Sequence, residues 1–555
     1  MNDTSEHKVP QAEGPPDLTG WKKLLPVVVH QAAGEDKTVQ IFWGKLIFLL
    51  LTLVSVGYLV LVSGLYFHAK YARGIQQAIF SDLLLPSRWE HHRVVLGDHY
   101  VSVAERQMRE GQTLDAFRNL RIGVAQSPGN VSGRLLLSRL YASANRFDQA
   151  QQTLLDGLPV LDFHPDFLQS LFGFLLQQQQ DALTLKIAKN LLAHDSAPSA
   201  RTGIIALAAA SACYFRGNYD RAEDFLTSYA ADRSYDGRLL LAQIDWERGY
   251  RELALLHLTA LARQFPGHES ASVQLGAWLR ALGRHDEFRR LALMRQLAQP
   301  QSPSSRIDLL YALRHDGETE KISRETAALL RQFPRDQTIL VALANFAANT
   351  GDAALARQVY DHGNRLGLTW EAPAFLTVEA LVVKRDYRGA LELTRALLND
   401  HPDWTKRHGA LFNSLQAVAC HGLGDTVSAQ LYLANFLGQA DLRADNLLAV
   451  ARRFADVGAK SQARLVLAQA VSADPLNQSA LTGLIQLDLE QNNLAPLPDN
   501  LRRLVAMRKP SADLLRAASY RLGSDLLLFS PQRDDTLRLI EQALAASSAA
   551  ARAKG

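Results

Sequence analysis

Few residues in this chain combine a reactive type with a spacing that chemistry requires. The densest group of possible metal ligands is Glu90, His91 and His92. Adjacent histidines on a helix point in different directions, and no further His, Cys or carboxylate follows at a metal-binding spacing. We therefore favour a solvent-facing helix over a metal site here, and we expect the protein to hold neither metal nor cofactor.

Patterns of nucleotide binding and hydrolysis are also missing from the sequence. There is no GxxxxGK[ST], GxSxG or HExxH motif, and no GxGxxG follows a strand. Sixty basic and 56 acidic residues leave a net charge of +4 over 555 residues, which is no electrostatic footprint for nucleic acid. We expect a protein that is not an enzyme and binds no nucleic acid. A membrane enzyme with an attached repeat array is the less favoured alternative.

The elements that position the remaining residues follow a repeat of 34 residues. Turn residues fall at ten registers, most of them 34 residues apart: Gly111, Asn145, Gly217, Gly249, Gly283, Gly317, Gly351, Arg385, Gly424 and Gly458. Alanine stands five residues after the turn in eight of the ten registers, and a small residue stands seven before it in eight. Proline follows the turn by 17 residues in six registers. Small residues let paired helices approach closely, and the proline ends the second helix.

This pattern resembles the tetratricopeptide repeat (TPR), a helix–turn–helix unit of 34 residues. The stretches GNYDRAEDFL (Gly217–Leu226) and RDYRGALELTRALLNDHP (Arg385–Pro402) are similar to the second helix of that family. Phe288 and Ile322 depart from it, because they stand where alanine is expected. The resemblance implies an all-α fold, a TPR-like α-solenoid wound as a right-handed superhelix of about ten to twelve repeats.

One segment is far more apolar than the rest. Residues Leu46–Phe67 read LIFLLLTLVSVGYLVLVSGLYF without a charge, and as a helix they would extend about 33 Å, enough to cross a membrane. We expect a single transmembrane helix that contacts the lipid bilayer through residues 46–67. The flanking charges balance, with Lys37 and Lys45 before it and Lys70 and Arg73 after it, so the charge rule leaves the orientation open.

These features divide the chain into six predicted segments. Residues 1–45 form a disordered tail, 46–67 the transmembrane helix, 68–94 a juxtamembrane helix and linker, 95–493 the repeat array, 494–545 a helical cap and 546–555 a frayed tail. The helix after the span is expected to continue through residues 68–85 and to stop at Pro86.

The two cysteines occupy equivalent positions of the repeat. Cys213 and Cys420 each lie four residues before a turn residue, where other registers have Leu, Tyr, Ala or Phe. Because they are several repeats apart, they cannot come close enough for a disulfide. We interpret both as buried thiols that pack as small hydrophobic residues.

The resemblance also implies a binding surface, since the first helices of TPR proteins line a concave groove. Family positions carried onto this chain place residues three, six and ten before each turn in that groove. The candidates for partner binding are Trp246, Arg280, Tyr311, Arg314, Asn345, Glu379 and Arg452. Arg, Tyr and Trp often carry interface energy, although the same side chains can simply be solvated.

These observations favour a single-pass, membrane-anchored TPR scaffold for protein partners. Frequent Arg and Ala with scarce Lys indicate a bacterial source, and anchored TPR proteins of this kind assist assembly of cell-envelope complexes, such as those of exopolysaccharide, secretion or cytochromes. We expect the array on the periplasmic side of the inner membrane. A docking platform that faces the cytoplasm is the alternative.

Overall fold

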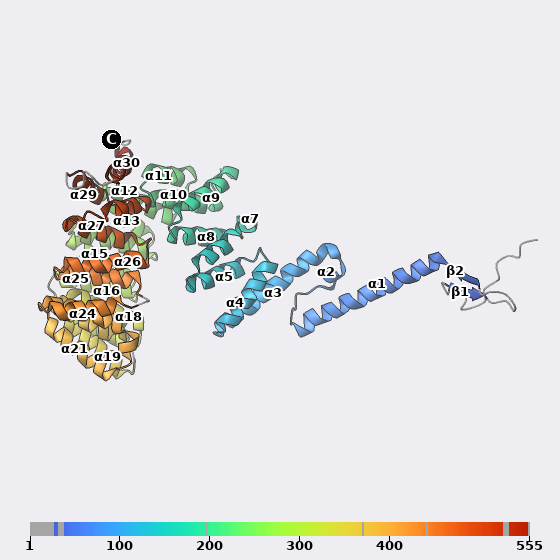
Figure 1. The fold of residues 1–555 in the computed structure, drawn as a ribbon, viewed down its shortest axis with the longest axis horizontal. Helices are drawn as coiled ribbons and strands as arrows, with labels where there is room; N and C mark the ends of the chain where they lie inside the picture. Colours follow the sequence, from blue (N-terminus) through green and yellow to red (C-terminus); the bar gives the residue numbers. More distant parts are fainter. Residues whose placement is uncertain are drawn as a thin grey trace, which may run out of the picture. The chain divides into compact units, whose positions relative to one another are not determined.

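The computed structural model describes residues 27–30, 38–195, 197–368, 371–439, 442–524 and 532–552. The chain divides into two compact units, Met1–Leu171 and Phe172–Gly555, with the boundary inside helix α8 (Pro165–Gln177). After a short β-hairpin in the first unit, helix follows helix through the described parts of both units (Figure 1). The expected fold class, an all-α solenoid of paired helices, is confirmed.

A short β-hairpin lies near the N-terminus, in the region predicted to be disordered. Strand β1 (Val27–His30) pairs antiparallel with β2 (Thr38–Ile41), and Val27 lies opposite Ile41. The β-branched run Val27–Val29 favours a strand. The prediction of disorder is therefore wrong for the two strands. Its remaining part at residues 1–26 and 31–37 lies outside the described residues.

Helix α1 (Trp43–Phe67) contains the apolar segment and begins slightly before it. A π-helical turn, η2 (His68–Ala72), continues α1, so that one helix extends over Trp43–Ala72. Of the helices described, this is the one long and apolar enough to cross a membrane. Its side chains face outward: Phe48 is 72% exposed and Leu53 is 69% exposed.

The continuous helix predicted for residues 68–85 is interrupted. Gly74 has a φ of 70°, a left-handed conformation that ends the helix, and the chain then turns back. Helix α2 (Phe80–Leu84) packs against α1, where the Tyr58 hydroxyl donates to the carbonyl oxygen of Leu84 at 2.7 Å. The 3-10 turn η3 (Pro86–Arg88) joins α2 to the first repeat.

The first unit then contains paired helices. They are α3 (Trp89–Arg109) with α4 (Thr113–Gln126), α5 (Val131–Ser143) with α6 (Phe147–Leu155), and the short α7 (Leu158–Leu161), which leads to α8. Helices α3 and α4 cross at Gly97 and Gly123. A Cβ atom added to Gly123 would lie 2.9 Å from the carbonyl oxygen of Gly97, so only glycine permits this approach.

The second unit continues the pairs from α9 (Asp181–His194) onward. The pairs are α10 (Ala200–Phe215) with α11 (Tyr219–Ser228), α12 (Tyr235–Glu247) with α13 (Arg251–Gln264), α14 (Glu269–Ala281) with α15 (His285–Ala298), α16 (Pro303–His315) with α17 (Thr319–Gln332), α18 (Gln337–Thr350) with α19 (Ala353–Arg365), α20 (Glu371–Val383) with α21 (Tyr387–Asp400), α23 (Gly409–Gly422) with α24 (Thr426–Leu437), and α25 (Ala444–Asp456) with α26 (Lys460–Ala473). Short turns of helix occur at η4 (Ala231–Arg233) and α22 (Trp404–Arg407), and the unit ends with α27 (Gln478–Glu490), α28 (Leu497–Ala506), α29 (Ala512–Leu522) and α30 (Arg533–Arg552).

The turns inside the repeats share one backbone conformation. All ten turn residues identified in the sequence have positive φ, from 57° at Asn145 to 88° at Gly249. Gln179 and Asn492 have it too, with φ of 56° and 55°, and they continue the 34-residue step from Asn145 and Gly458. The repeat pattern therefore includes two further turns, which are not among the ten identified from the sequence.

The small residues of the repeat lie where the paired helices cross. The eight alanines that follow the turns are at most 3% exposed. The two residues that depart from the pattern, Phe288 and Ile322, are buried as well, and Phe288 packs against a glycine. A Cβ on Gly276 would lie 3.3 Å from the Phe288 ring, so a glycine on α14 accommodates the phenylalanine on α15.

We expect the positive φ at the turns to be a backbone requirement independent of packing. A Cβ on Gly249 would meet no atom within 4 Å, so Gly249→Ala tests conformation alone and should destabilise the α12–α13 pair by about 1 kcal/mol. Gly203→Ala is the matched control, because Gly203 lies inside α10 with equally open surroundings and should stabilise by about 0.5–1 kcal/mol. Native-state hydrogen exchange of the two helix pairs measures both, and equal effects of the same sign would contradict the assignment.

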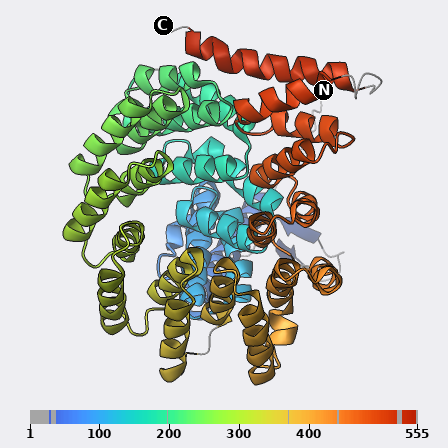
Figure 2. The ribbon, with the colours of Figure 1, turned by 90° about the vertical axis from the view of Figure 1, so that its left-hand side faces the viewer.

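The second unit curves until its two ends meet. Figure 2 shows its helices following one another around an arc, so that α27–α29 lie beside α10–α12. The segment Met507–Lys509 after α28, which we call the closing segment, makes most of these contacts. The Arg216 side chain donates to the carbonyl oxygen of Met507 at 2.6 Å, and Lys509 pairs with Glu247. The unit is therefore a closed ring of repeats.

Candidate interaction surfaces

Polar side chains from four first helices meet on one face of the second unit. The Arg453 guanidinium on α25 donates to the carboxylate of Glu379 on α20 at 2.9 Å and to the Asn349 side-chain oxygen on α18 at 3.4 Å. The Asn349 amide donates in turn to the Tyr311 hydroxyl on α16 at 3.3 Å. Arg453 is 74 residues from Glu379 and 104 residues from Asn349 in the sequence. Side chains of repeats so far apart can meet only if the first helices face the inside of the curve.

We call these four side chains, Tyr311, Asn349, Glu379 and Arg453, the inner-face network. Because they bond to one another, they are not free to bind a partner. The side chains of Arg453 and Glu379 are each 16% exposed, so their ion pair is largely removed from water. A partner that engages Glu379 must compete with Arg453. Tyr311 packs edge to face against Phe346, with ring centroids 4.9 Å apart. The network therefore offers a preformed polar surface and not a set of free side chains.

Aromatic rings form a second part of the inner face. Trp246 on α12 stacks on Trp278 on α14, with ring centroids 4.2 Å apart and planes within 6°. The Arg251 guanidinium lies 5.5 Å from the centroid of the Trp246 ring. Because Trp278 is buried and only 7% exposed, the stack fixes the orientation of the partly exposed Trp246, and Trp246 is the ring that a partner could contact.

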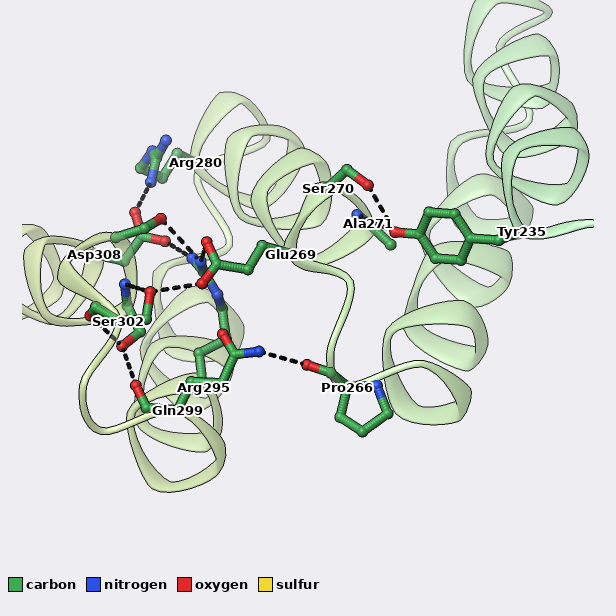
Figure 3. A network of polar contacts seen from close by, with 12 residues as sticks. Tyr235, Pro266, Glu269, Ser270, Ala271, Arg280, Arg295, Gln299, Ser302 and Asp308 are labelled. Atoms are coloured by element: carbon green, nitrogen blue, oxygen red, sulfur yellow. Dashed lines mark hydrogen bonds and ion pairs between the residues drawn. The ribbon is translucent and has the colours of Figure 1, made fainter. Parts of the chain in front are cut away.

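Arg280 is tied into a polar network at the ends of α14–α16 (Figure 3). Its guanidinium donates to Asp308 at 3.3 Å, and Asp308 also pairs with Arg295, whose side chain is only 6% exposed. Burial raises the pKa of Asp308 above its ordinary value, against the opposing effect of the two arginines. Arg280 also lies over the Phe288 ring, so its guanidinium already has two contacts within the protein although the side chain is 42% exposed.

The seven predicted partner-binding residues lie in different environments in the structure. Tyr311 and Glu379 join one network, whereas Trp246 and Arg280 belong to separate contacts. Arg314 is exposed and donates to the Thr350 carbonyl at 3.5 Å. Asn345 and Arg452 are exposed, and neither has a polar contact within the described part of the chain. Whether these residues bind a partner stays a prediction.

Sequence reasoning missed Trp278, Asn349 and Arg453. Trp278 and Arg453 each lie five residues before the turn of their repeat. At this position most other repeats have a small or apolar residue, such as Ala312, Ala380 or Ala419. A charged residue at a mostly apolar position, as at Arg453, indicates that this position borders the inner face. Asn349 gave none, because it lies at the helix end next to the turn.

The candidate metal and thiol chemistry has an ordinary structural explanation. His91 accepts or donates a hydrogen bond with buried Asp82 at 2.6 Å. No group of three or more His, Cys, Asp or Glu side chains converges among the residues that the structure describes. Cys213 and Cys420 are free and buried, as expected, and burial raises the pKa of both thiols.

The ring closure contains a buried carboxylate. The side chain of Asp181 on α9 is 1% exposed and pairs with Arg216 at 2.9 Å and with Arg508 of the closing segment at 3.4 Å. The Arg508 guanidinium also lies 3.3 Å from the centroid of the Phe215 ring. Burial raises the pKa of Asp181 above its ordinary value despite both arginines.

The raised pKa of Asp181 predicts a pH dependence. Because the folded state holds this proton more tightly than the unfolded state, Asp181 stabilises the protein below the ordinary Asp pKa of about 3.9, and that contribution is lost as pH rises through the folded pKa. As pH rises from about 4 through the folded pKa, Asp181→Asn should therefore show a less negative slope of unfolding free energy against pH than the wild type. Urea unfolding across that range measures it. A slope in the variant that equals that of the wild type or is more negative would contradict the prediction.

Comparison with known proteins agrees with the repeat geometry. Residues 107–169, which include α4–α7, match the family model of the tetratricopeptide repeat. The same turn conformation and 34-residue step extend from this region to Asn492. Residues 107–169 therefore match tetratricopeptide repeats, and the fold of the described array is a TPR-like α-solenoid. Its TPR units are the helix pairs, and the turn residues join the two helices of each.

Several solved structures are similar to the TPR chain at low identity. A complex of Naa15 and Naa10 bound to HypK is 17% identical, with 89% of this chain and 79% of that chain covered and a TM-score of 0.27. A tetratricopeptide repeat protein from Parabacteroides merdae is 16% identical, with coverage of 46% and 98% and a TM-score of 0.27. The APC/C hetero-tetramer Cut9-Hcn1 is 12% identical, with coverage of 83% and 96% and a TM-score of 0.25. No curated protein matches the chain.

Proposed function

We propose that this protein is a single-pass membrane scaffold whose TPR array binds partner proteins and organises a bacterial cell-envelope complex. The observation that carries the proposal is the conjunction of an exposed apolar helix, Trp43–Ala72, with a TPR array on one chain. We assign no catalytic activity to it.

The exposure of α1 supports membrane anchoring. Along the outer surface of α1, side chains such as Phe48, Leu53 and Val60 are 67–72% exposed, and a row of this kind in water would be costly to leave uncovered. Lipid tails can cover these side chains, and the helix is long enough to cross the hydrocarbon core of about 30 Å. The segment that folds back packs only against the C-terminal half of α1, where Tyr58 hydrogen-bonds to Leu84 and Val62 is 2% exposed.

The inner face of the second unit supports protein binding. TPR arrays bind proteins along curved surfaces formed by consecutive repeats. Here the partly exposed Trp246, which is held in place by stacking on the buried Trp278, and the exposed Arg314 and Arg452 give aromatic and cationic groups of the kinds that are enriched at interfaces.

We place the array on the periplasmic side of a bacterial inner membrane. Two free, buried cysteines suit an oxidising compartment, since neither thiol is available for mispairing. The composition, rich in Arg and Ala and poor in Lys, supports a bacterial source. A docking platform that faces the cytoplasm is the second candidate, because the charges that flank α1 balance.

The anchor is tested by inserting charge into α1. The wild-type protein should remain in membranes after alkaline carbonate extraction, whereas Leu53→Arg with Val56→Arg should release it, because each arginine costs about 2.5–3.5 kcal/mol at the centre of a span. Leu114→Arg, on the 67% exposed Leu114 of α4, is the matched control and should remain in membranes. Extraction of the wild type would contradict the anchor. A phosphatase reporter fused after Gly555 distinguishes the two orientations, with activity expected for a periplasmic array.

A further inference from the structure

The outer side of the second unit contains a cavity of about 420 Å³ between two second helices. It lies between α13 and α15, with α14 beneath, and Leu255, Leu275, Leu279 and Leu291 line it. We call this space the outer groove. Arg280, the predicted inner-face position on α14, is not among the residues that line it. A volume in the range of about 300–1,000 Å³ with mainly apolar lining is typical of sites that receive a ligand group.

The rim of the outer groove is apolar and exposed. Leu256 on α13 is 63% exposed, and Met294 and Leu297 on α15 are 51% and 83% exposed. Leu256 precedes the lining residues Thr259 and Arg263 by three and seven positions, so it belongs to the same side of α13. Apolar side chains therefore continue from the cavity onto both edges of the groove, which gives the elongated apolar surface that a helix requires.

The charged side chains around the outer groove favour an occupant that carries negative charge. Both carboxylates that line it are paired within the protein: Glu269 with Arg295 at 3.5 Å, and Glu287 with Arg284 at 2.6 Å. The lining guanidinium groups of Arg263 and Arg290 are exposed, and neither has a partner among the described residues. One cation stands on each helix that borders the groove, so an occupant with carboxylates on both flanks would complement it.

We propose that the outer groove binds an amphipathic helix of a partner protein, with apolar residues at i, i+3 or i+4 and i+7 and with Asp or Glu beside them. The apolar residues enter the cavity and contact Leu256, Met294 and Leu297, while the acids pair with Arg263 and Arg290. This inference rests on the proposed function of a protein-binding scaffold. It adds a second surface, distinct from the inner face, and states the chemistry of what binds there.

The test uses the full-length protein in its native membranes with a photo-crosslinking amino acid at Leu297. We expect an adduct whose crosslinked peptide, mapped by mass spectrometry, is an acidic amphipathic segment of another protein. Arg263→Glu with Arg290→Glu should reduce that adduct about tenfold or more. Arg388→Glu with Arg395→Glu, on exposed arginines of α21, is the matched control with the same charge change and should leave the adduct unchanged.

A synthetic peptide of the mapped segment gives the second measurement. Its affinity for the purified protein in detergent, measured by fluorescence anisotropy, should fall about tenfold or more with the groove variant and not with the control. An adduct that maps to a second copy of this chain, to lipid, or to a basic segment overturns the proposal, as does equal loss in both variants. If no adduct forms at Leu297 while partners still co-purify through the inner face, the outer groove fails and the scaffold function stands. If no partner co-purifies at all, the scaffold function itself fails.

Discussion

Replacement of Arg508 and Lys509 together by alanine should open the ring of the second unit. Arg508 is a partner of Asp181, whose side chain is 1% exposed, and Lys509 pairs with Glu247. Removal of one partner from a largely buried ion pair costs about 3–5 kcal/mol, and we expect the lower end because Arg216 still contacts Asp181. The hydrogen bonds from Arg216 to the Met507 carbonyl oxygen and from Gln179 to the Leu476 carbonyl oxygen remain, but both charged side chains of the closing segment are lost, and we expect this loss to separate the ends.

Small-angle scattering measures the opening as an increase in the radius of gyration, and hydrogen exchange should rise in α9 and α10. Arg516→Ala with Arg521→Ala on α29 is the control. Arg516 contacts only exposed Asp513 three residues away, so this pair of changes should leave the scattering unchanged. An unchanged radius in the Arg508 and Lys509 variant would contradict the closed ring.

Arg464→Ala should have the largest effect on the stability of a single repeat, about 3–5 kcal/mol. Arg464 on α26 pairs with Asp488 on α27, whose side chain is 0% exposed and also accepts a hydrogen bond from the Asn493 amide at 2.8 Å. Without Arg464, a fully buried carboxylate loses its opposite charge. Hydrogen exchange of α26 and α27 reports the local opening free energy.

Two further variants separate charge burial from loss of a surface contact. Lys460→Ala removes another ion pair between the same helices, but Lys460 and Glu490 are 55% and 37% exposed, so the cost should stay below about 1 kcal/mol. Arg464→Leu with Asp488→Leu should recover most of the stability, because two apolar groups need no pairing. If the Lys460 and Arg464 variants were equally destabilised, the argument from burial would fail.

The turns and the ends of the helices could be predicted from the sequence, because each depends on the conformational preference of a single residue. A turn between two paired helices needs positive φ, and Gly249 or Asn145 meets that need, so the repeat could be located from the turns alone. Helices α13 and α21 end two residues before Pro266 and Pro402, as the prolines predict. Gln179 carried no such signal, because a glutamine with positive φ is held there by its surroundings.

Features that depend on contacts distant in sequence could not be read in the same way. The pairing of Arg453 with Glu379 depends on the curvature of the whole array, and the pairing of Lys509 with Glu247 depends on where the ring closes. The return of α2 onto α1 depends on a single left-handed residue, Gly74, inside a stretch that otherwise favours helix. Curvature is a sum of small rotations between repeats, and no local pattern specifies it.

The most direct test of the account is whether the inner face of the array selects partners. Arg280 is already paired with Asp308, so Arg314→Glu with Arg452→Glu is the better choice of variant, because both side chains are exposed. Full-length wild type and variant should be purified from their own membranes in detergent and compared by quantitative mass spectrometry, after circular dichroism has shown equal helicity. We predict a discrete set of proteins that is enriched with the wild type and lost with the variant. Identical sets with both proteins would contradict the claim that this is a scaffold that binds through its inner face.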